Sequence, residues 1–278
     1  MITFPDHEAF AALYPETSGT LTHGLVDHPL LQLDALVALA GRLDPATVEY
    51  NRGNLPVGVD PAAAIGNGLS IAETIAGIES NGSWMVLKFI ERDPAYCALL
   101  DAALDALLPI VRPRTGAMLK REGFIFVSSP NSVTPFHFDP EHNILCQIRG
   151  TKTMNVFPAD DDSIVSGAEH ERFHMGGHRN TPWHDAFAAK GTAHALTPGD
   201  AIYVPVKAPH WVKNGPETSI SLSVTWRSEW SFAEADARGM NAVLRGMGLR
   251  PKAPGRWPAR NRAKALGYRV VRRMRGGG

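Results

Sequence analysis

The stretch TPFHFDPEHN, residues 134–143, places two histidines, two acidic residues and an asparagine within ten positions. Apolar segments rich in β-branched and aromatic residues flank it on both sides, and such residues favour strands. Side chains alternate across a strand, so His137 and Asp139 are expected to point to the same face. The stretch therefore predicts two convergent metal-binding side chains on one strand.

Short strand-like segments continue outward from this stretch through the second half of the chain. Between Lys120 and Trp226 they are GFIFVSS, TPFHFD, NILCQIR, TKTMNVFP, DAIYVPV, HWVKN and SISLSVTW. Gly, Pro and Asn punctuate them, and QIRGTKTMNV looks like two strands joined by a tight turn at Gly150. Many short strands with regular turn signals are typical of a barrel or jelly roll.

Helical patterns flank the strands. Ser70 and Glu73 form a capping-box pattern, and Asp27 and Asp93 are candidate N-caps. Residues 159–196 interrupt the strands with a polar loop that carries five histidines. The predicted helices are 28–43, the segment from Ser70, 93–111, 231–248 and 259–275. We therefore predict a mainly β fold with flanking helices.

A third metal ligand has to come from another strand. The segment TPGDAIYVPVKAPHWV, residues 197–212, has a Pro-Gly-Asp turn, a strand, a proline-rich turn and a second strand that starts at His210. In a rolled antiparallel sheet His210 can lie beside His137 and Asp139. Two histidines and one carboxylate form the facial triad of non-haem Fe(II) oxygenases. His142 lies three positions from Asp139, so we do not expect it to share that face.

These motifs resemble the JmjC-type, cupin-like 2-oxoglutarate oxygenases, and in motif most of all the asparaginyl hydroxylase of hypoxia-inducible factor. The pattern T-P-x-H-x-D-x-x-x-N-x-x-x-Q-I-x-G-x-K runs from Thr134 to Lys152. A second block runs from PGDAIYVP through His210 to SLSVTW. The resemblance implies a double-stranded β-helix core, Fe(II) as the metal, and 2-oxoglutarate and dioxygen as cosubstrates.

The resemblance also implies roles for single residues. His137, Asp139 and His210 match the iron ligands, and they are also the expected catalytic residues. Four further positions correspond to cosubstrate-binding residues of the family: Lys152, Thr134, Asn143 and Thr225. Lys152 would pair with the distal carboxylate of 2-oxoglutarate, helped by Thr134. Thr225 stands where the asparaginyl hydroxylase has a second asparagine.

Two points stay open at the level of sequence. The asparaginyl hydroxylase has a cosubstrate-binding tyrosine on an earlier strand, whereas the similar segment SWMVLKF has none, and Trp84 or Lys88 lies nearby. Lys152 either points into the barrel, where it needs an anion, or faces solvent. Strand alternation alone does not decide between these two orientations.

Composition limits the class of protein. Of the 278 residues, 44% are hydrophobic, which is typical of a globular chain. No apolar run approaches the ~18 residues that span a bilayer, and MITFPDHEAF lacks the pattern of a signal peptide. Cys97 and Cys146 form no CxxC pair. We expect a reduced, cytoplasmic protein with no membrane partner.

The net charge of zero hides an asymmetry. From Arg238 onward the chain has 12 Lys or Arg and no Asp or Glu, which leaves 16 basic and 28 acidic residues before it. Such a tail can bind nucleic acid, an acidic partner or the acidic body of the protein, or it is simply solvated. The expected division is an N-terminal region at 1–117, a jelly-roll core at 118–230 and a basic helical extension at 231–278.

Three functions fit the sequence. The first is an oxygenase that couples 2-oxoglutarate decarboxylation to hydroxylation of a protein side chain or small molecule, or to demethylation at an N-methyl carbon. The second is a non-catalytic cupin-like protein that binds a partner through its tail. The third is a metal-dependent cupin enzyme without 2-oxoglutarate. The helix at 231–248 has apolar residues at helical spacing, which fits either packing within the chain or a homodimer.

Overall fold

Two antiparallel sheets form the centre of the molecule. The computed structural model describes residues 6–53, 56–58, 67–274 and 276. In spatial order, the major sheet consists of β1 (Gly19–Thr22), β9 (Asp200–Val204), β6 (His142–Arg149), β11 (Ser219–Ser228), β4 (Met118–Ser128), β3 (Ser83–Lys88) and β2 (Val48–Arg52). The minor sheet consists of β5 (Val133–His137), β10 (His210–Asn214), β7 (Lys152–Val156) and β8 (Thr192–Leu196). The predicted jelly-roll core with flanking helices is confirmed.

The alternation of residues along β11 shows how the sequence separates the two faces of the major sheet. Ile220, Leu222 and Trp226 belong to the largest apolar core, on the outer face of the sheet. Ser221 and Ser223 lie between them on the opposite face, toward the minor sheet. The segment SISLSVTW is therefore apolar toward the helices and polar toward the inside of the jelly roll.

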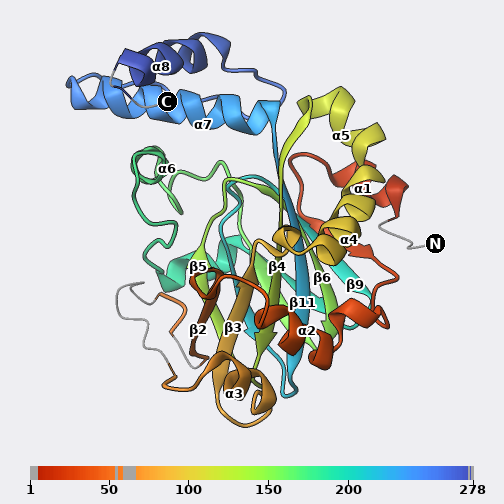
Figure 1. Cartoon of the computed structure of the whole chain (residues 1–278). Coiled ribbons are helices and arrows are strands. Elements are labelled where there is room, and N and C mark those ends of the chain that lie inside the picture. The colour runs from red at the N-terminus through yellow and green to blue at the C-terminus, as the bar shows by residue number, and fades with distance from the viewer. Residues whose placement is uncertain (1–5, 54–55, 59–66, 275, 277–278) are drawn as a thin grey trace.

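Helices from the first half of the chain cover the outer face of the major sheet (Figure 1). Their apolar residues join those of the sheet in one core. The helices are α1 (His7–Leu13), α2 (Leu33–Ala40), α3 (Ile71–Ala76), α4 (Pro94–Asp105) and α5 (Leu108–Thr115). Short 3-10 turns lie at Pro29–Leu31, Pro45–Thr47 and Ile90–Arg92.

Two predicted helices are shorter than their apolar patterns suggest. The 28–43 segment is not one helix capped by Asp27, because the extended residue Gln32 separates the turn at Pro29–Leu31 from α2. The 93–111 segment divides into α4 and α5, which are bent by 67°. Pro109 lies in the first turn of α5, where its missing N–H costs no helical hydrogen bond.

The predicted caps at Asp93 and at Ser70 with Glu73 are confirmed. Gly150 also has the predicted turn conformation, with a φ of 69°. A side chain at Gly150 would collide with the carbonyl oxygen of Thr218. No single described helix is long and apolar enough to cross a membrane, and only the bent pair α4 and α5 reaches that length and composition together.

The insertion at 159–196 is more ordered than the predicted loop. It contains α6 (Gly167–His174), a 3-10 helix at Asp185–Lys190 and β8. Ser166 and Glu169 form a capping box that starts α6. Its apolar residues cover Phe136, which stands on the opposite face of β5 from His137, and Phe138, which follows that strand. The insertion therefore forms a separate apolar cluster behind β5.

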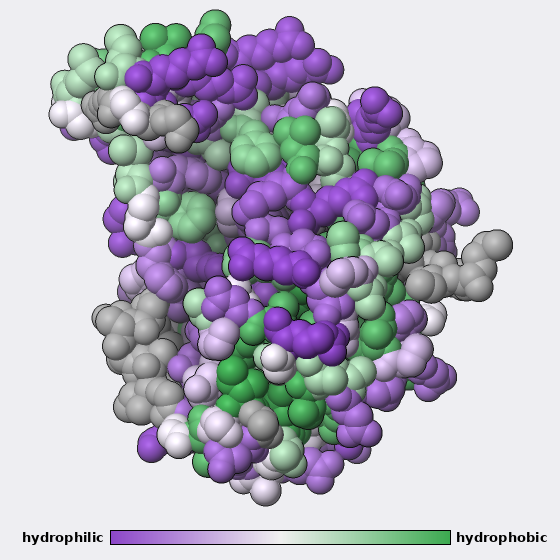
Figure 2. All heavy atoms as spheres, viewed as in Figure 1, coloured by the Kyte–Doolittle hydropathy of each residue, from purple (hydrophilic) through white to green (hydrophobic). Residues whose placement is uncertain are grey.

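The basic C-terminal segment folds into a helical hairpin of α7 (Glu229–Gly246) and α8 (Arg262–Met274), which lies at one end of the jelly roll (Figure 1). Figure 2 shows mostly hydrophilic side chains over this hairpin, with apolar ones among them. Ion pairs join it to acidic residues outside the hairpin, at Arg245–Glu171 and Arg256–Glu16. Further ion pairs lie within the hairpin itself: Arg238–Glu234, Arg269–Asp236 and Arg272–Asp236. Of the sequence-based alternatives, binding to the protein's own body agrees with these contacts.

His142 is a core residue. Its Nδ1 lies 2.9 Å from the hydroxyl of Tyr203 and its Nε2 lies 3.1 Å from the hydroxyl of Ser228. Its ring stacks on Trp226 at 5.2 Å between centroids, and the side chain is fully buried. Burial, together with Arg227 and Arg256, holds the pKa of His142 well below its ordinary value. The folded protein therefore keeps this imidazole neutral.

This neutral histidine predicts a pH dependence of stability. The unfolded chain protonates His142 with a pKa near 6.5, so the unfolding free energy should fall as pH drops below about 6.5. Between about pH 7.5 and 5.5, the loss should be about 1.4 kcal/mol smaller in His142→Gln than in the parent. Urea unfolding of the metal-free proteins measures this difference. Identical pH profiles for parent and variant would show that His142 takes up a proton as readily in the folded protein as in the unfolded chain.

Candidate metal centre

Three side chains converge inside the jelly roll. His137 ends β5 and His210 begins β10, whereas Asp139 lies two residues beyond the end of β5 rather than on the strand predicted to carry it together with His137. One potential ligand atom from each residue lies within 4.8 Å of the others. Nε2 of His137 is 3.6 Å and Nε2 of His210 is 3.7 Å from Oδ2 of Asp139. The structure thus brings together all three residues that the sequence predicted as ligands.

The pairing of β5 with β10 produces this convergence. His210 lies directly opposite His137 in the antiparallel register, and residues opposite each other share a face. The register then shifts, so that Val212 lies opposite Thr134 rather than Pro135. A β-bulge of this kind returns Thr134 to the face of His137 although three positions separate them. Strand alternation alone would have placed Thr134 on the other face.

Main-chain carbonyls orient both imidazole rings. Nδ1 of His137 lies 2.7 Å from the carbonyl oxygen of Pro135. Nδ1 of His210 lies 3.0 Å from the carbonyl oxygen of Ala208. A carbonyl only accepts hydrogen bonds, so Nδ1 carries the proton and the lone pair of each Nε2 points toward Asp139. This is the tautomer that binds a metal through Nε2.

Arg179 holds the carboxylate of Asp139 from the other side. Its Nη1 donates to Oδ1 of Asp139 at 2.6 Å, which leaves Oδ2 facing the two histidines. Burial would raise the pKa of Asp139, but Arg179 and the two histidines keep it below its ordinary value. Burial and His210 lower the pKa of His137 to about 3. An ionised carboxylate beside a neutral imidazole is the protonation state that binds a divalent cation.

Lys152 points into the jelly roll. Its side chain is buried, with 6% of the residue exposed. Within the part of the chain that the structure describes, its ammonium has no hydrogen-bond or ion-pair partner. Burial lowers the pKa of Lys152 to about 7. The inward orientation is thus settled, and the interior contains a cationic group without a counter-ion.

The other predicted cosubstrate residues also lie on inward-facing positions. Asn143 on β6 pairs with Thr225 on β11. Oδ1 of Asn143 accepts a hydrogen bond of 2.6 Å from Ser223, which leaves its amide N–H groups as donors. The hydroxyl of Thr225 donates instead to the carbonyl of Glu122 at 2.9 Å. The cosubstrate roles of Thr134, Asn143 and Thr225 stay predictions.

Trp84 and Lys88, the residues near the position of the tyrosine in the asparaginyl hydroxylase, differ in whether their hydrogen-bond donors are already used. Lys88 forms an ion pair of 2.5 Å with Glu49 on the neighbouring strand β2. Trp84 stands on β3, and its indole N–H is buried without a hydrogen-bond partner. Of these two, Trp84 therefore has the free donor.

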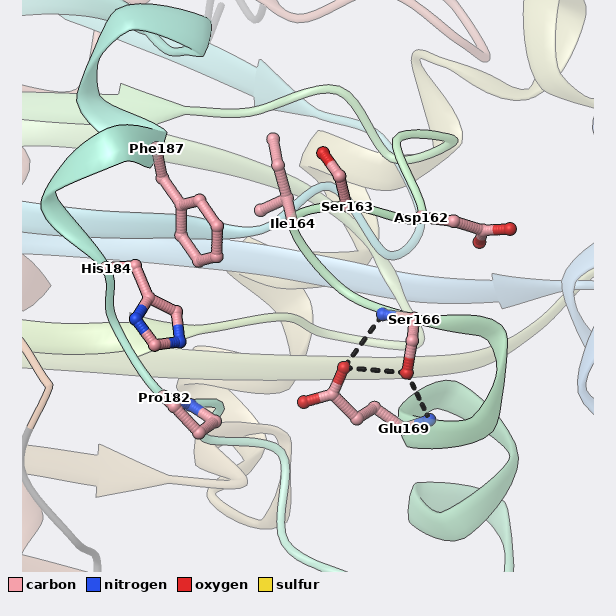
Figure 3. Close-up of a pocket in the computed structure, with 8 residues that line it drawn as sticks. All are labelled: Asp162, Ser163, Ile164, Ser166, Glu169, Pro182, His184 and Phe187. Carbon is pink, nitrogen blue, oxygen red and sulfur yellow. Dashed lines mark hydrogen bonds between the residues drawn. The ribbon is translucent and has the colours of Figure 1, made fainter.

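The histidines of the insertion do not form a second centre. Among the described residues, the group His137, Asp139 and His210 is the one set of three with ligand spacing. His170 is buried against Phe138 at 4.6 Å between ring centroids, and Nε2 of His174 lies 2.5 Å from Nζ of Lys207. His184 borders a cavity of about 270 Å³, with Phe187 on its own side and the capping box of Ser166 and Glu169 facing it (Figure 3). None of the residues lining this cavity belongs to the candidate metal centre.

Two residues at the centre were not foreseen from the sequence. Arg179 lies 40 positions after Asp139 in the polar insertion, where no pattern connects it to the metal-binding strand. Lys207 stands in the turn before His210, and its main-chain N–H donates to the carbonyl of Asp139 at 2.7 Å. The sequence VPVKAPH places Lys207 close to His210, but it does not show a contact with Asp139.

Comparison with known proteins agrees with this architecture. Residues 104–232 match the profile of the cupin-like domain. Over 106 residues the chain is 31% identical to Jumonji C domain-containing protein 5 of Drosophila melanogaster, covering 34% of this chain and 25% of that protein. Over 104 residues it is 29% identical to Lysine-specific demethylase JMJ30 of Arabidopsis thaliana, covering 35% and 24%. The chain thus spans about a quarter of the length of these relatives.

Solved structures extend the likeness to the whole chain at the level of fold. The structure of Escherichia coli YcfD superposes with a TM-score of 0.53 at 18% identity, covering 95% of this chain and 66% of YcfD. YcfD, described as a ribosomal oxygenase, in complex with cobalt and 2-oxoglutarate gives a TM-score of 0.50 at 16% identity, covering 96% and 66%. The segment that carries the three convergent residues therefore matches a cupin-like domain, and the chain has the fold of YcfD.

Proposed function

We propose that this protein is an Fe(II)- and 2-oxoglutarate-dependent oxygenase that hydroxylates its substrate. The observation that carries the proposal is the convergence of His137, Asp139 and His210 in an interior that also contains the unpaired ammonium of Lys152. The donor set suits Fe(II) and leaves coordination positions open. A buried ammonium without a counter-ion suits a dicarboxylate cosubstrate. YcfD, which has the same fold, was solved with cobalt and 2-oxoglutarate.

Each residue has a physical task in this proposal. His137 and His210 would bind iron through Nε2, because Nδ1 of each ring carries a proton that it donates to a main-chain carbonyl. Asp139 would bind through Oδ2, because Arg179 holds Oδ1. Lys152 would neutralise the distal carboxylate of 2-oxoglutarate. Iron, when bound with 2-oxoglutarate and dioxygen, supplies the oxidation of a substrate C–H bond.

The two alternative functions fit the structure less well. A metal-dependent cupin enzyme without 2-oxoglutarate leaves Lys152 buried without an anion, which is costly. A non-catalytic protein that binds nucleic acid through its tail would have to compete with the ion pairs that Arg245, Arg256 and Arg269 already form within the chain. The particular likeness to the asparaginyl hydroxylase stays a prediction from the motif.

The first test concerns the metal ligands. His137→Ala and Asp139→Ala should lose Fe(II) binding and activity, because two remaining ligands do not hold the ion. Both variants should keep the parent's circular dichroism. The measurement is iron content per chain after anaerobic loading and desalting, with His184→Ala as a histidine control outside the centre. Full iron occupancy in both variants would show that the ligand assignment is wrong.

The second test concerns the cosubstrate. Lys152→Ala should weaken 2-oxoglutarate binding at least about 100-fold, since breaking a buried ion pair costs about 3–5 kcal/mol and each tenfold is 1.4 kcal/mol. Lys152→Arg should also be impaired, because a planar guanidinium does not replace an ammonium. The readout is titration of the visible charge-transfer band of the anaerobic Fe(II) protein. The exposed Lys120→Ala is the control.

The same titration has an expected pH dependence. The pKa of Lys152 is about 7 without an anion, and a bound carboxylate would raise it. In the parent, 2-oxoglutarate affinity should therefore weaken as pH rises above about 7, and Lys152→Ala should lack this dependence. An unchanged 2-oxoglutarate affinity in Lys152→Ala would show that Lys152 does not bind the cosubstrate.

We further propose a homodimer, and we assign its contact to the outer face of α8 instead of the helix at 231–248 that the sequence suggested. Leu266, Val270 and Met274 follow each other at helical spacing there and are 48–75% exposed. In the parent, light scattering should give the mass of two chains, and Leu266→Glu should give the mass of one. Val37→Glu, at an exposed apolar position of α2, should leave the dimer intact. A parent that stays monomeric would contradict the proposal.

The assignment of regions and location follows the same proposal. We infer a catalytic core at 118–230, an N-terminal region at 1–117 that packs on it, and a helical extension at 231–278. The protein would work in the cytoplasm, where Cys97 and Cys146, which form no disulfide, stay reduced.

A further inference from the structure

The turn between β9 and β10 connects the candidate ligands to the rest of the molecule. The N–H of Lys207 in this turn donates to the carbonyl of Asp139 at 2.7 Å. The next residue, Ala208, accepts the hydrogen bond from the ring of His210. Two consecutive residues of one turn therefore contact two of the three candidate ligand residues: Asp139, which lies just after β5, and His210, which begins β10. A shift of the turn would move both.

The backbone of Lys207 needs support from its surroundings. Its φ of 63° is in the left-handed region, which residues other than glycine occupy at a cost. Such a conformation persists when the neighbouring structure determines it. The side chain of Lys207 is fully buried, so its contacts with the surrounding residues can hold the backbone in this conformation.

The side chain of Lys207 reaches the C-terminal helix. Its Nζ lies 3.2 Å from Oε2 of Glu234 on α7 and 2.5 Å from Nε2 of His174 on α6. Glu234 is 1% exposed, and its other oxygen accepts a hydrogen bond of 2.8 Å from Arg238. An unpaired charge at this depth is strongly destabilising. The position of Lys207 therefore depends on the docking of α7.

The connection between α7 and α8 adds a second link to the same turn. Nη1 of Arg256 donates to the carbonyl of Val206 at 3.0 Å, next to Lys207. Nε of Arg256 is paired with Glu16 at 2.7 Å. The C-terminal segment thus contacts the turn through the Lys207–Glu234 ion pair and through a hydrogen bond from the side chain of Arg256 to the carbonyl of Val206.

We propose that Lys207 is a positioning residue that couples the docking of α7, through Glu234, to the geometry of the metal centre. The inference rests on the proposed metal-binding function of His137, Asp139 and His210. Lys207 does not itself contact the metal position. Its main chain holds the backbone of Asp139 and the turn that orients His210, and its side chain fixes that turn on α7. Helix α7 then supports the metal centre from outside, through Lys207.

The test measures metal affinity rather than turnover. Co(II) is titrated into the metal-free full-length parent and into Lys207→Met, Glu234→Gln and the double variant, and the visible Co(II) bands are followed. Each single variant should bind Co(II) about 10–100-fold more weakly, as expected for groups that support metal ligands, with altered band positions. The double variant should bind about as weakly as the weaker single variant, because both act through one contact.

Arg245→Met is the matched control. It removes an ion pair of 2.6 Å between α7 and Glu171 of α6 without touching the turn. Its thermal midpoint should fall while its Co(II) affinity and spectrum stay those of the parent. The control separates weakened docking of the hairpin in general from loss of the Lys207–Glu234 contact.

The outcomes are distinguishable. Single variants that bind Co(II) like the parent would overturn the coupling while leaving the proposed function intact. Effects that multiply in the double variant would show that the two residues act independently, which also overturns it. A parent that binds no Co(II) would overturn the proposed function itself. If Lys207→Met does not fold, the nearly isosteric Glu234→Gln decides the question on its own.

Discussion

The antiparallel pairing of β10 with β5 is the constraint on which the candidate site depends. Because His210 lies opposite His137, the two rings approach to 4.2 Å between centroids. A slip of one residue would turn His210 to the other face of the sheet and separate it from Asp139. The same strand β10 also pairs with β7, where Asn214 lies opposite Lys152. One register therefore positions both the candidate metal ligands and the buried side chain of Lys152.

Much of the fold and the three convergent residues could be predicted from the sequence because local patterns carry that information. Alternation and turn residues marked the strands, and the spacing of His137 and Asp139 placed them on one face. The direction of Lys152 could not be predicted, since alternation does not say which face is inward. Thr134 reaches its position through a bulge, which depends on the partner strand. Arg179 and Lys207 both contact Asp139 from positions far along the chain, and no local sequence pattern predicts such contacts.

The errors in the predicted helices have the same origin. The apolar spacing of 93–111 continues through the break, so periodicity alone suggested one helix, although Pro109 marks the start of a second. In the 28–43 segment, the side chain of Gln32 bonds to the carbonyls of Val26 and His28, which stabilises an extended residue between two helical turns. The insertion at 159–196 was expected to be a loop because its apolar residues are sparse. These few apolar residues are enough to order the insertion, because they pack against Phe136 and Phe138 in one cluster.

The separation of the two histidines along the chain has a consequence for how the protein matures. His137 and His210 are 73 positions apart, and no local element holds them together before β10 joins the minor sheet. Closing so long a loop carries an entropic cost that only later contacts repay. An unfinished chain therefore offers a metal ion at most the isolated pair His137 and Asp139. Metal would be acquired by the folded protein, after synthesis, rather than serving as the nucleus around which the chain folds.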